Sequence, residues 1–395
     1  MGKHALRIAG IVLFAWTSLC AASEQILSPA SARSGEPNLT HGADGRLYLS
    51  WIETDPRGVA TLRFSMWNDD AWSQPQRVAS GDDWFVNWAD FPSVCALADG
   101  TLAAHWLQKS GGGTYSYDVM ISLSRDQGKT WSKPLTPHRD GTRTEHGFVS
   151  LVPMTSTTFG VFWLDGRNMA HDRGDMSLRF ITLGRDGRLG KQRLVDARVC
   201  ECCQTSAVVL ASGDPFVVYR DRSADEIRDI WTATLHDGEI VRSHSINPDG
   251  WVIQGCPVNG PATRRHDNTV VVAWHTVQDE RSEVRVRFSG DSGKTFGNTV
   301  RVDDGQPLGR VDVVLVNSDV AVVSWLETRG DDAEIRWRLI DRNGGRKASQ
   351  TVAATRASRA AGFPQMEYVG GSLFFAWTDT KNPARVRTAR LPITP

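Results

Sequence analysis

The sequence has no excess charge of either sign and few long apolar runs. Lys and Arg total 45, and Asp and Glu also total 45, so the formal net charge is zero. Proteins that bind nucleic acid or anionic membrane surfaces concentrate basic residues, so this balance argues against both partners. After the first residues, no stretch approaches the ~18 apolar residues that a transmembrane helix needs. We therefore expect no membrane span in the mature chain.

The N-terminal residues have the pattern of an export signal. Lys3 and Arg7 precede an apolar run that is too short for a transmembrane helix, and small residues follow up to Ala22. This order is that of a secretory signal peptide, so residues 1–22 are expected to be removed. The mature protein is then exported to the periplasm or the extracellular space. A lipoprotein anchored through Cys20 is the alternative, although the residue before that cysteine is not small.

Tyrosine is scarce, with 5 residues, whereas 15 tryptophans and 36 glycines are present. Much of the tryptophan belongs to one repeated pattern, a short apolar strand that ends in an aromatic and then a polar residue. The copies are separated by 51 to 57 residues, a regularity that indicates a repeat architecture. The aromatic residue of each copy is Trp51, Trp106, Trp163, Tyr219, Trp274, Trp325 or Trp377.

Each copy lies inside a larger unit of short predicted strands. A strand precedes the aromatic copy, as at residues 91–97, and another follows it, as at residues 119–124, before a weaker fourth strand. Four short antiparallel strands repeated about every 50 residues are typical of a β-propeller blade. We predict a single all-β propeller over residues 23–395, with seven blades favoured over six. Residues 24–29 are expected to supply the missing fourth strand of the last blade. A pair of stacked β-sandwiches does not explain one sustained period.

Two turns share the pattern Ser-x-Asp-x-Gly-x-Thr-aromatic, at residues 124–131 and 289–296. The Asp and Ser side chains can bond turn amides, the glycine accepts a positive φ, and the aromatic packs between strands. This is the Asp-box, or bacterial neuraminidase repeat, and the chain thus resembles the sialidase superfamily of propellers over nearly its whole mature length. Asp-boxes are structural, so Asp126 and Asp291 are not expected to be catalytic.

Chemically reactive residues gather where the first strand of each blade begins and where its second strand joins the third. These positions share one face of a propeller, so they line one funnel. Carboxylates, arginines and histidines there suit a polar or anionic ligand. The first-strand starts carry Glu36, Trp88, Asp90, Glu145, His146, Asn259 and Arg310, and the second-to-third loops carry Tyr115, Tyr117, Asp165, Arg167, His171, Arg220, Asp221, Arg222, Glu226 and His275.

The resemblance implies work on a carbohydrate or glycoconjugate. Sialidases place three arginines on the substrate carboxylate and use a Tyr nucleophile with a Glu partner and an Asp acid/base. We therefore expect a glycoside hydrolase of exo-α-sialidase type. The Arg-Ile-Pro motif of that family is absent, so the open alternatives are a polysaccharide lyase and a non-catalytic carbohydrate- or metal-binding propeller. The catalytic candidates are Asp90, Glu145, Tyr117 and Glu36, and the substrate-binding candidates are Arg220, Arg222, Arg310, His146, Asn259 and Trp88.

Five cysteines remain after removal of the signal segment. Cys95 falls within a strand and is expected to be a buried free thiol. The other four are Cys200, Cys202, Cys203 and Cys256, and all fall on the candidate face. In an exported protein we expect disulfides that tie these loops, with Cys256 bonded to one of the other three. A soft-metal site made by Cys202, Cys203 and Cys256, with His146 or His275, is the alternative. No cofactor is expected otherwise.

Overall fold

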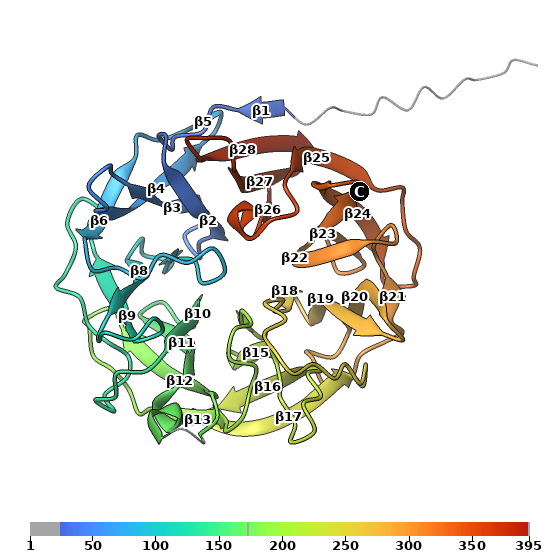
Figure 1. Cartoon of the computed structure of the whole chain (residues 1–395), viewed down its shortest axis with the longest axis horizontal. Helices are drawn as coiled ribbons and strands as arrows, with labels where there is room; N and C mark the ends of the chain where they lie inside the picture. Colours follow the sequence, from blue (N-terminus) through green and yellow to red (C-terminus); the bar gives the residue numbers. More distant parts are fainter. Residues whose placement is uncertain (1–23, 172–173, 394–395) are drawn as a thin grey trace, which may run out of the picture.

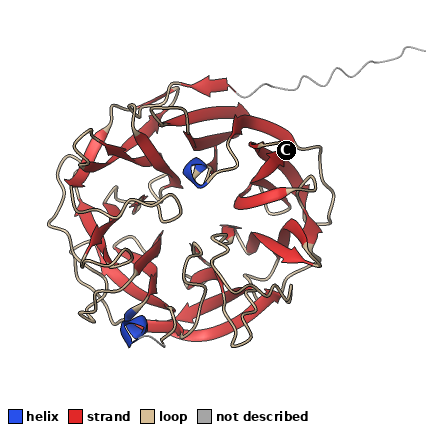
Figure 2. Cartoon of the chain, viewed as in Figure 1, coloured by secondary structure: helices blue, strands red, loops and turns tan. Residues whose placement is uncertain are grey.

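A computed structural model describes residues 24–171 and 174–393 of the chain (Figure 1). The predicted signal peptide, residues 1–22, lies outside the described residues. Almost all regular structure in the described part is antiparallel β-strand, with two short 3₁₀ turns, η1 (Arg167–His171) and η2 (Arg359–Ala361) (Figure 2). Neither of these turns approaches the length and apolarity of a membrane-spanning helix.

Seven antiparallel sheets stand in a ring around a central axis (Figure 1). The first strands of the sheets neighbour one another around that axis. The fold is therefore the predicted all-β propeller with seven blades. From the axis outwards, blade one is β2 (Ser34–His41), β3 (Leu47–Thr54), β4 (Ala60–Asn68) and β6 (Gln76–Gly81), with β5 (Ala71–Trp72) beside β4; blade two is β7 (Ser93–Ala96), β8 (Leu102–Lys109) and β9 (Tyr117–Ser124); and blade three is β10 (His146–Pro153), β11 (Thr158–Asp165), β12 (Ser177–Gly184) and β13 (Arg193–Asp196). Blade four is β14 (Ser206–Val209), β15 (Pro215–Arg220), β16 (Ile230–His236) and β17 (Glu239–Asn247), and blade five is β18 (Ala262–His266), β19 (Thr269–Gln278), β20 (Arg281–Ser289) and β21 (Val300–Arg301). Blade six is β22 (Pro307–Leu315), β23 (Val320–Arg329), β24 (Asp332–Asp341) and β25 (Gln350–Thr355), and blade seven is β26 (Gln365–Val369), β27 (Ser372–Asp379), β28 (Arg385–Pro392) and β1 (Glu24–Ile26).

Blade two differs from the prediction of four strands. Its sheet has three strands among the described residues, and the fourth position holds only a single bridge between Ile121 and Leu135. The Asp-box turn directly follows β9, as the second one follows β20 in blade five, where a short fourth strand β21 still forms. The tryptophan that ends the turn, Trp131, packs against the core of blades one and two.

The apolar core lies between the blades. Each of seven buried clusters combines side chains from two neighbouring sheets, including a pair across the junction of blades seven and one. The seven repeated aromatics all lie on second strands and are at most 4% exposed. In three blades the indole N–H donates to the carboxylate two residues later, as from Trp163 to Asp165 at 2.8 Å. In these three blades the bond accounts for the polar residue after the aromatic, whereas Trp274 donates to Asp249 and Tyr219 to Asp196.

The ring is closed by the N-terminal strand. β1 pairs with β28, with Gln25 opposite Ala389, and so completes blade seven as its outermost strand. The sequence predicts this closure from residues 24–29. Pairing covers the edge of β28, which would otherwise present unpaired backbone groups to other chains.

Both Asp-box turns have the predicted structural role. In the turn after β9, Asp126 Oδ1 accepts the Thr130 N–H at 2.9 Å, and the Ser124 hydroxyl accepts the Gly128 N–H at 2.8 Å. Gly128 has a φ of 87°, which favours glycine. The second turn repeats these contacts around Asp291 and Gly293. These hydrogen bonds lower the pKa of each aspartate to about 2, so both stay ionised and bonded to the backbone.

Candidate active site

Three of the four predicted catalytic residues meet between blades two and three, at the end of the ring where the first strands begin, which we call the mouth. Tyr117 and Asp90 are almost fully buried there. Tyr117 begins β9, and its N–H donates to the Thr144 carbonyl at 3.2 Å. This contact forms a parallel bridge between Tyr117 and Glu145, so the two side chains emerge next to each other. The Tyr117 hydroxyl donates to Glu145 Oε1 at 2.7 Å and lies 3.4 Å from Asp90 Oδ2. The backbone therefore holds a phenol between two carboxyl groups.

Asp90 is fixed by the neighbouring blade. Its Oδ1 accepts the N–H of Phe148 at 2.9 Å. The residue before Phe148 is Gly147, where any Cβ would overlap Asp90 Oδ2 and crowd the Tyr117 ring. Only glycine lets the start of β10 approach the carboxyl this closely, so the sequence at 147 is part of the site.

Burial sets the protonation of the two carboxyls. It raises the pKa of Asp90 to about 8; the Phe148 N–H opposes this shift, and the negative charge of Glu145 adds to it. Burial also raises the pKa of Glu145 to about 7, against the hydrogen bond from Tyr117. The pKa of Tyr117 is raised well above its usual range, again mainly by burial. Near neutral pH the site can therefore hold a protonated Asp90, an ionised Glu145 and a neutral phenol.

An aromatic side chain that the sequence analysis did not single out fixes the tyrosine ring. Phe85 stacks on Tyr117 with ring centroids 4.1 Å apart and planes inclined by 10°. On its other side Phe85 contacts Tyr115, which is 60% exposed at the mouth. Trp84, the residue before Phe85, packs on Trp106 and is buried. Two consecutive aromatic residues at 84 and 85 were the only sign in the sequence that an aromatic side chain would pack at the site. Their side chains contact different neighbours, Trp106 and Tyr117.

The loop before β7 reaches across the axis. Gln204 of blade four donates to the Ala89 carbonyl at 2.5 Å and accepts the Gly260 N–H of blade five. Trp88 stacks on Phe363 of blade seven with centroids 5.9 Å apart. This loop therefore contacts loops of blades four and seven over the axis. A cavity of about 740 Å³ lies along the inner strands, with Gln204 and Phe363 among its lining, but Asp90, Tyr117 and Glu145 do not line it.

Arg310 is the predicted arginine that lies over this loop. Its guanidinium stacks on Trp88 at 4.8 Å, and Nη1 donates to the carbonyls of Ser358 and Gly362. Burial lowers the pKa of Arg310 to about 10, which still leaves it charged at neutral pH. The Nε and Nη2 donors have no hydrogen-bond partner within the described chain. Arg310 is therefore anchored with donors left for a ligand.

Asn259 makes the contact in blade five that Asp90 makes in blade two. Asn259 Oδ1 accepts the Arg310 N–H at 2.7 Å, as Asp90 Oδ1 accepts that of Phe148. Arg310 and Phe148 have φ of 53° and 52°, and each follows a glycine at the start of its first strand. The Asn259 amide also donates to two carbonyls. The side chain of this predicted binding residue is thus engaged by the protein, within its own loop at Pro257 and with blade six at Leu308 and Arg310.

The other two predicted arginines are engaged by the protein. Arg220 is 1% exposed and donates to three carbonyls, those of Asn259, Arg228 and His275. Arg222 pairs with Glu226 at 2.7 Å and also with Glu201. The structure does not bring Arg220, Arg222 and Arg310 together as free groups around one position, because two of the guanidinium groups are used in joining loops.

Glu36 and His146 lie apart from this group. Glu36 starts β2 in blade one, where burial raises its pKa to about 7. Within the described chain no hydrogen bond or ion pair links it to Tyr117 or to either carboxyl. His146 is 0% exposed, so its ring faces the interior although Glu145 beside it faces the mouth. Neither residue contacts the Asp90–Tyr117–Glu145 group through its side chain.

The His146 ring belongs to a buried charged cluster behind the site. It stacks on His138 with centroids 3.9 Å apart and planes inclined by 4°. Asp118, Asp140 and Asp165 surround the pair. Two groups of three offer metal-ligand atoms within 4.8 Å of one another, namely Asp118 with His138 and His146, and Asp140 with His146 and Asp165. Parallel stacked rings cannot both direct a nitrogen at one ion, and Arg167 already pairs with Asp140 and Asp165. The cluster is thus largely compensated by protein charges.

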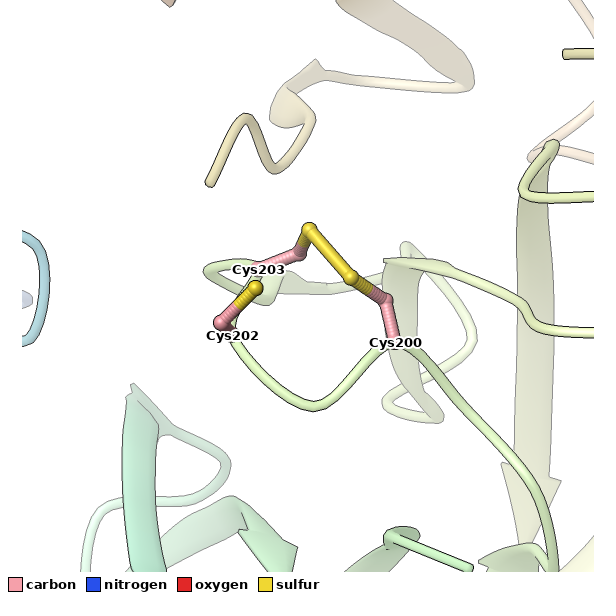
Figure 3. Close-up of side chains that lie close together, drawn as sticks. All are labelled: Cys200, Cys202 and Cys203. Carbon is pink, nitrogen blue, oxygen red and sulfur yellow. A yellow bond between two sulfur atoms is a disulfide. The ribbon is translucent and has the colours of Figure 1, made fainter. Parts of the chain in front are cut away.

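The cysteines form two disulfides at the same mouth. Cys202 bonds to Cys256 and joins the loops that precede β14 and β18, as the sequence predicts for Cys256. Cys200 bonds to Cys203 within one loop (Figure 3). Cys95 is buried and free, as expected.

Comparison with known proteins supports this architecture. A family model described as a BNR repeat-like domain matches residues 59–319. The chain belongs to this family. The predicted resemblance to the BNR propellers of the sialidase superfamily is thus confirmed. A search of curated proteins by sequence found no match.

Solved structures share the BNR propeller fold. A protein of unknown function from Dyadobacter fermentans matches with a TM-score of 0.55 at 13% identity, covering 94% of this chain and 98% of that one. A Penicillium chrysogenum alpha-L-arabinanase matches with a TM-score of 0.51 at 13% identity, covering 82% and 99%. A Hadza microbial sialidase matches with a TM-score of 0.50 at 13% identity, covering 84% and 73%. At these identities the likeness concerns the fold alone.

Proposed function

We propose that the protein is an exported glycoside hydrolase that cleaves glycosides of an acidic sugar with retention, in the manner of an exo-α-sialidase. The observation that carries this proposal is the Tyr117 hydroxyl bonded to Glu145 at 2.7 Å with Asp90 3.4 Å away. Family membership and propeller neighbours described as a sialidase and an arabinanase support a carbohydrate substrate. A neutral phenol suits a negatively charged sugar, because a carboxylate nucleophile would repel it.

The residues have complementary roles in this reaction. Tyr117 attacks the anomeric carbon while its proton passes to Glu145, and protonated Asp90 gives its proton to the departing glycosidic oxygen. In the second step water attacks the anomeric carbon and Asp90 takes a proton from that water. The bond between the sugar and the Tyr117 oxygen breaks, and Tyr117 regains its proton from Glu145. Arg310 holds the carboxylate of the sugar through its remaining donors. No metal or cofactor enters either step.

The first experiment measures release of sugar from an aryl sialoside by the mature protein and by three variants, Tyr117→Phe, Glu145→Gln and Asp90→Asn. Each loss of a proton-transfer group is expected to lower kcat/KM about 10²-fold or more. Asp90→Asn should remain folded, because Asn259 shows that an amide oxygen can hold the next blade. It should lose less activity on an aryl sialoside with an acidic leaving group than on an alkyl sialoside, because the former needs little proton donation.

A matched control is Asp312→Asn. Like Asp90, Asp312 is buried and accepts an N–H from the next blade, that of Met366 at 2.7 Å, but it lies on β22 of blade six and not beside Tyr117. This variant should keep its activity. If sialosides are inert and polysaccharides of uronic acids yield unsaturated products instead, the same residues serve a lyase. Binding without any product would overturn the enzymatic proposal.

A further inference from the structure

Four cysteine sulfurs gather at one point of the mouth, between blades four and five. The sulfurs of Cys200, Cys202 and Cys203 lie within 4.8 Å of one another (Figure 3), and Cys202 is also bonded to Cys256. They come from two irregular loops, residues 197–205 and 248–261, rather than from strands. Loops of this kind can adjust by the small shifts that a change of sulfur chemistry demands.

Fastening the two loops needs only half of these cysteines. The Cys202–Cys256 bond spans 54 residues, so it removes much loop-closure entropy from the unfolded chain. The Cys200–Cys203 bond spans a separation of 3 residues and restricts the unfolded chain far less. Structural stapling therefore explains the first bond better than the second.

One guanidinium contacts the sulfurs. Arg228 Nη1 lies 3.4 Å from Cys200 Sγ, and Arg228 is 2% exposed. This guanidinium also pairs with Glu201 and Glu226, and Glu201 pairs with Arg222, so its charge is shared with carboxylates. A guanidinium at this distance can donate to a Cys200 thiolate and so stabilise it.

Access to the cluster is one-sided. Cys200 and Cys203 are 1% and 2% exposed, whereas Cys256 is exposed at the mouth. A small reductant or an ion can reach Cys256 and Cys202 first, and the inner pair only through them. The Cys200–Cys203 pair is therefore shielded from solvent, while the Cys202–Cys256 pair gives an ion a path into the cluster.

We propose that the four cysteines, once reduced, bind one soft metal ion such as Zn²⁺ or Cu⁺. An external dithiol supplies two electrons and two protons to each disulfide, giving four thiols and the oxidised dithiol. The ion then displaces the thiol protons as it binds. Four sulfurs around a tetrahedral ion with ~2.3 Å bonds lie about 3.8 Å apart. Three of the sulfurs, those of Cys200, Cys202 and Cys203, already lie within 4.8 Å of one another, and the exposed Cys256 has to move toward them with its loop. The disulfide form is the metal-free state.

The test uses the full mature protein, reduced without oxygen, freed of reductant and titrated with Co²⁺. One equivalent should bind and give the intense visible bands of tetrahedral cobalt thiolate, and Zn²⁺ should displace it. Cys203→Ser and Cys256→Ser should each weaken binding about tenfold or more. Cys95→Ala, which changes the buried cysteine of blade two, should bind cobalt unchanged.

Two results would overturn the proposal: no stoichiometric cobalt binding by the reduced protein, or equal binding by the wild type and the Cys256→Ser variant. Because Cys256 is exposed, that variant is expected to fold, and its circular dichroism checks this. The readout is spectroscopic and does not depend on the sugar chemistry, so it stands or falls separately from the hydrolase.

Discussion

At the scale of the residue, Asp90 combines a structural contact with a chemical one. One of its oxygens accepts the Phe148 N–H and fixes blade three, while the other faces the Tyr117 hydroxyl. In blade five the same structural contact is made by Asn259, which cannot supply a proton. The fold therefore does not require a carboxylic acid at position 90. The proposed chemistry does, because it uses the raised pKa of Asp90.

The two carboxyls predict a bell-shaped pH profile of kcat/KM. Glu145 works as a base only when ionised, so activity rises as pH passes about 7. Asp90 works as an acid only when protonated, so activity falls as pH passes about 8. Since the two carboxyls interact, the rising and falling limbs of the profile report apparent pKa values of the pair, not of either residue alone. The Asp90→Asn variant, assayed with an aryl sialoside that has an acidic leaving group, should lose the alkaline limb. A wild-type profile that stays flat across both values would contradict these roles.

Residue types at the site were predictable, but their partners were not. Position in the repeat was enough to place Asp90, Tyr117 and Glu145 at one face. Nothing local distinguishes Arg220, whose donors meet three carbonyls from other segments, from Arg310, which keeps free donors. Such contacts depend on how distant loops pack, so single-sequence reasoning treats all three arginines alike.

At the scale of the element, the Asp-box glycine joins its turn to the preceding blade. Gly293 has a φ of 77°, and a Cβ there would lie 2.6 Å from the Phe216 ring of blade four. Gly128 has the same relation to Phe64 of blade one. The turn motif was legible from sequence because its bonds are local, whereas this contact between blades was not.

Gly293→Ala should therefore destabilise more than an alanine at another positive-φ glycine. Gly213 has a φ of 89° in the turn between β14 and β15, and nothing lies within 4 Å of its added Cβ. We expect a loss of about 1 kcal/mol for Gly213→Ala from backbone strain alone, and about 2–3 kcal/mol for Gly293→Ala. Denaturant unfolding of both variants measures this difference. Equal losses would show that Phe216 moves aside freely.

At the scale of the whole molecule, the sequence period determines the ring. Seven aromatic repeats define seven second strands, and each is found on its own blade. The weak fourth strands were the least certain part, and blade two lacks one among the described residues. Outer strands carry fewer buried side chains, so their pattern is the faintest in the sequence.

Removal of residues 24–26 from the mature chain should open the ring. β28 would then become an exposed edge, and about 1 kcal/mol is lost for each ladder hydrogen bond. Thermal unfolding should shift to lower temperature, and light scattering should reveal self-association. The mature chain that retains these residues is the control. A truncated protein that stays monomeric with an unchanged Tm would contradict the closure.

Closure by β1 also sets an order of events in time. The Thr388 hydroxyl donates to the carbonyl of Ile26 across 362 residues of chain. The last blade cannot be completed until the final strand has been synthesised, so a growing chain holds blade one without its neighbour. A chain that is unable to finish its ring early stays open during synthesis, and this would suit the export proposed above, in which the chain crosses a membrane before it folds.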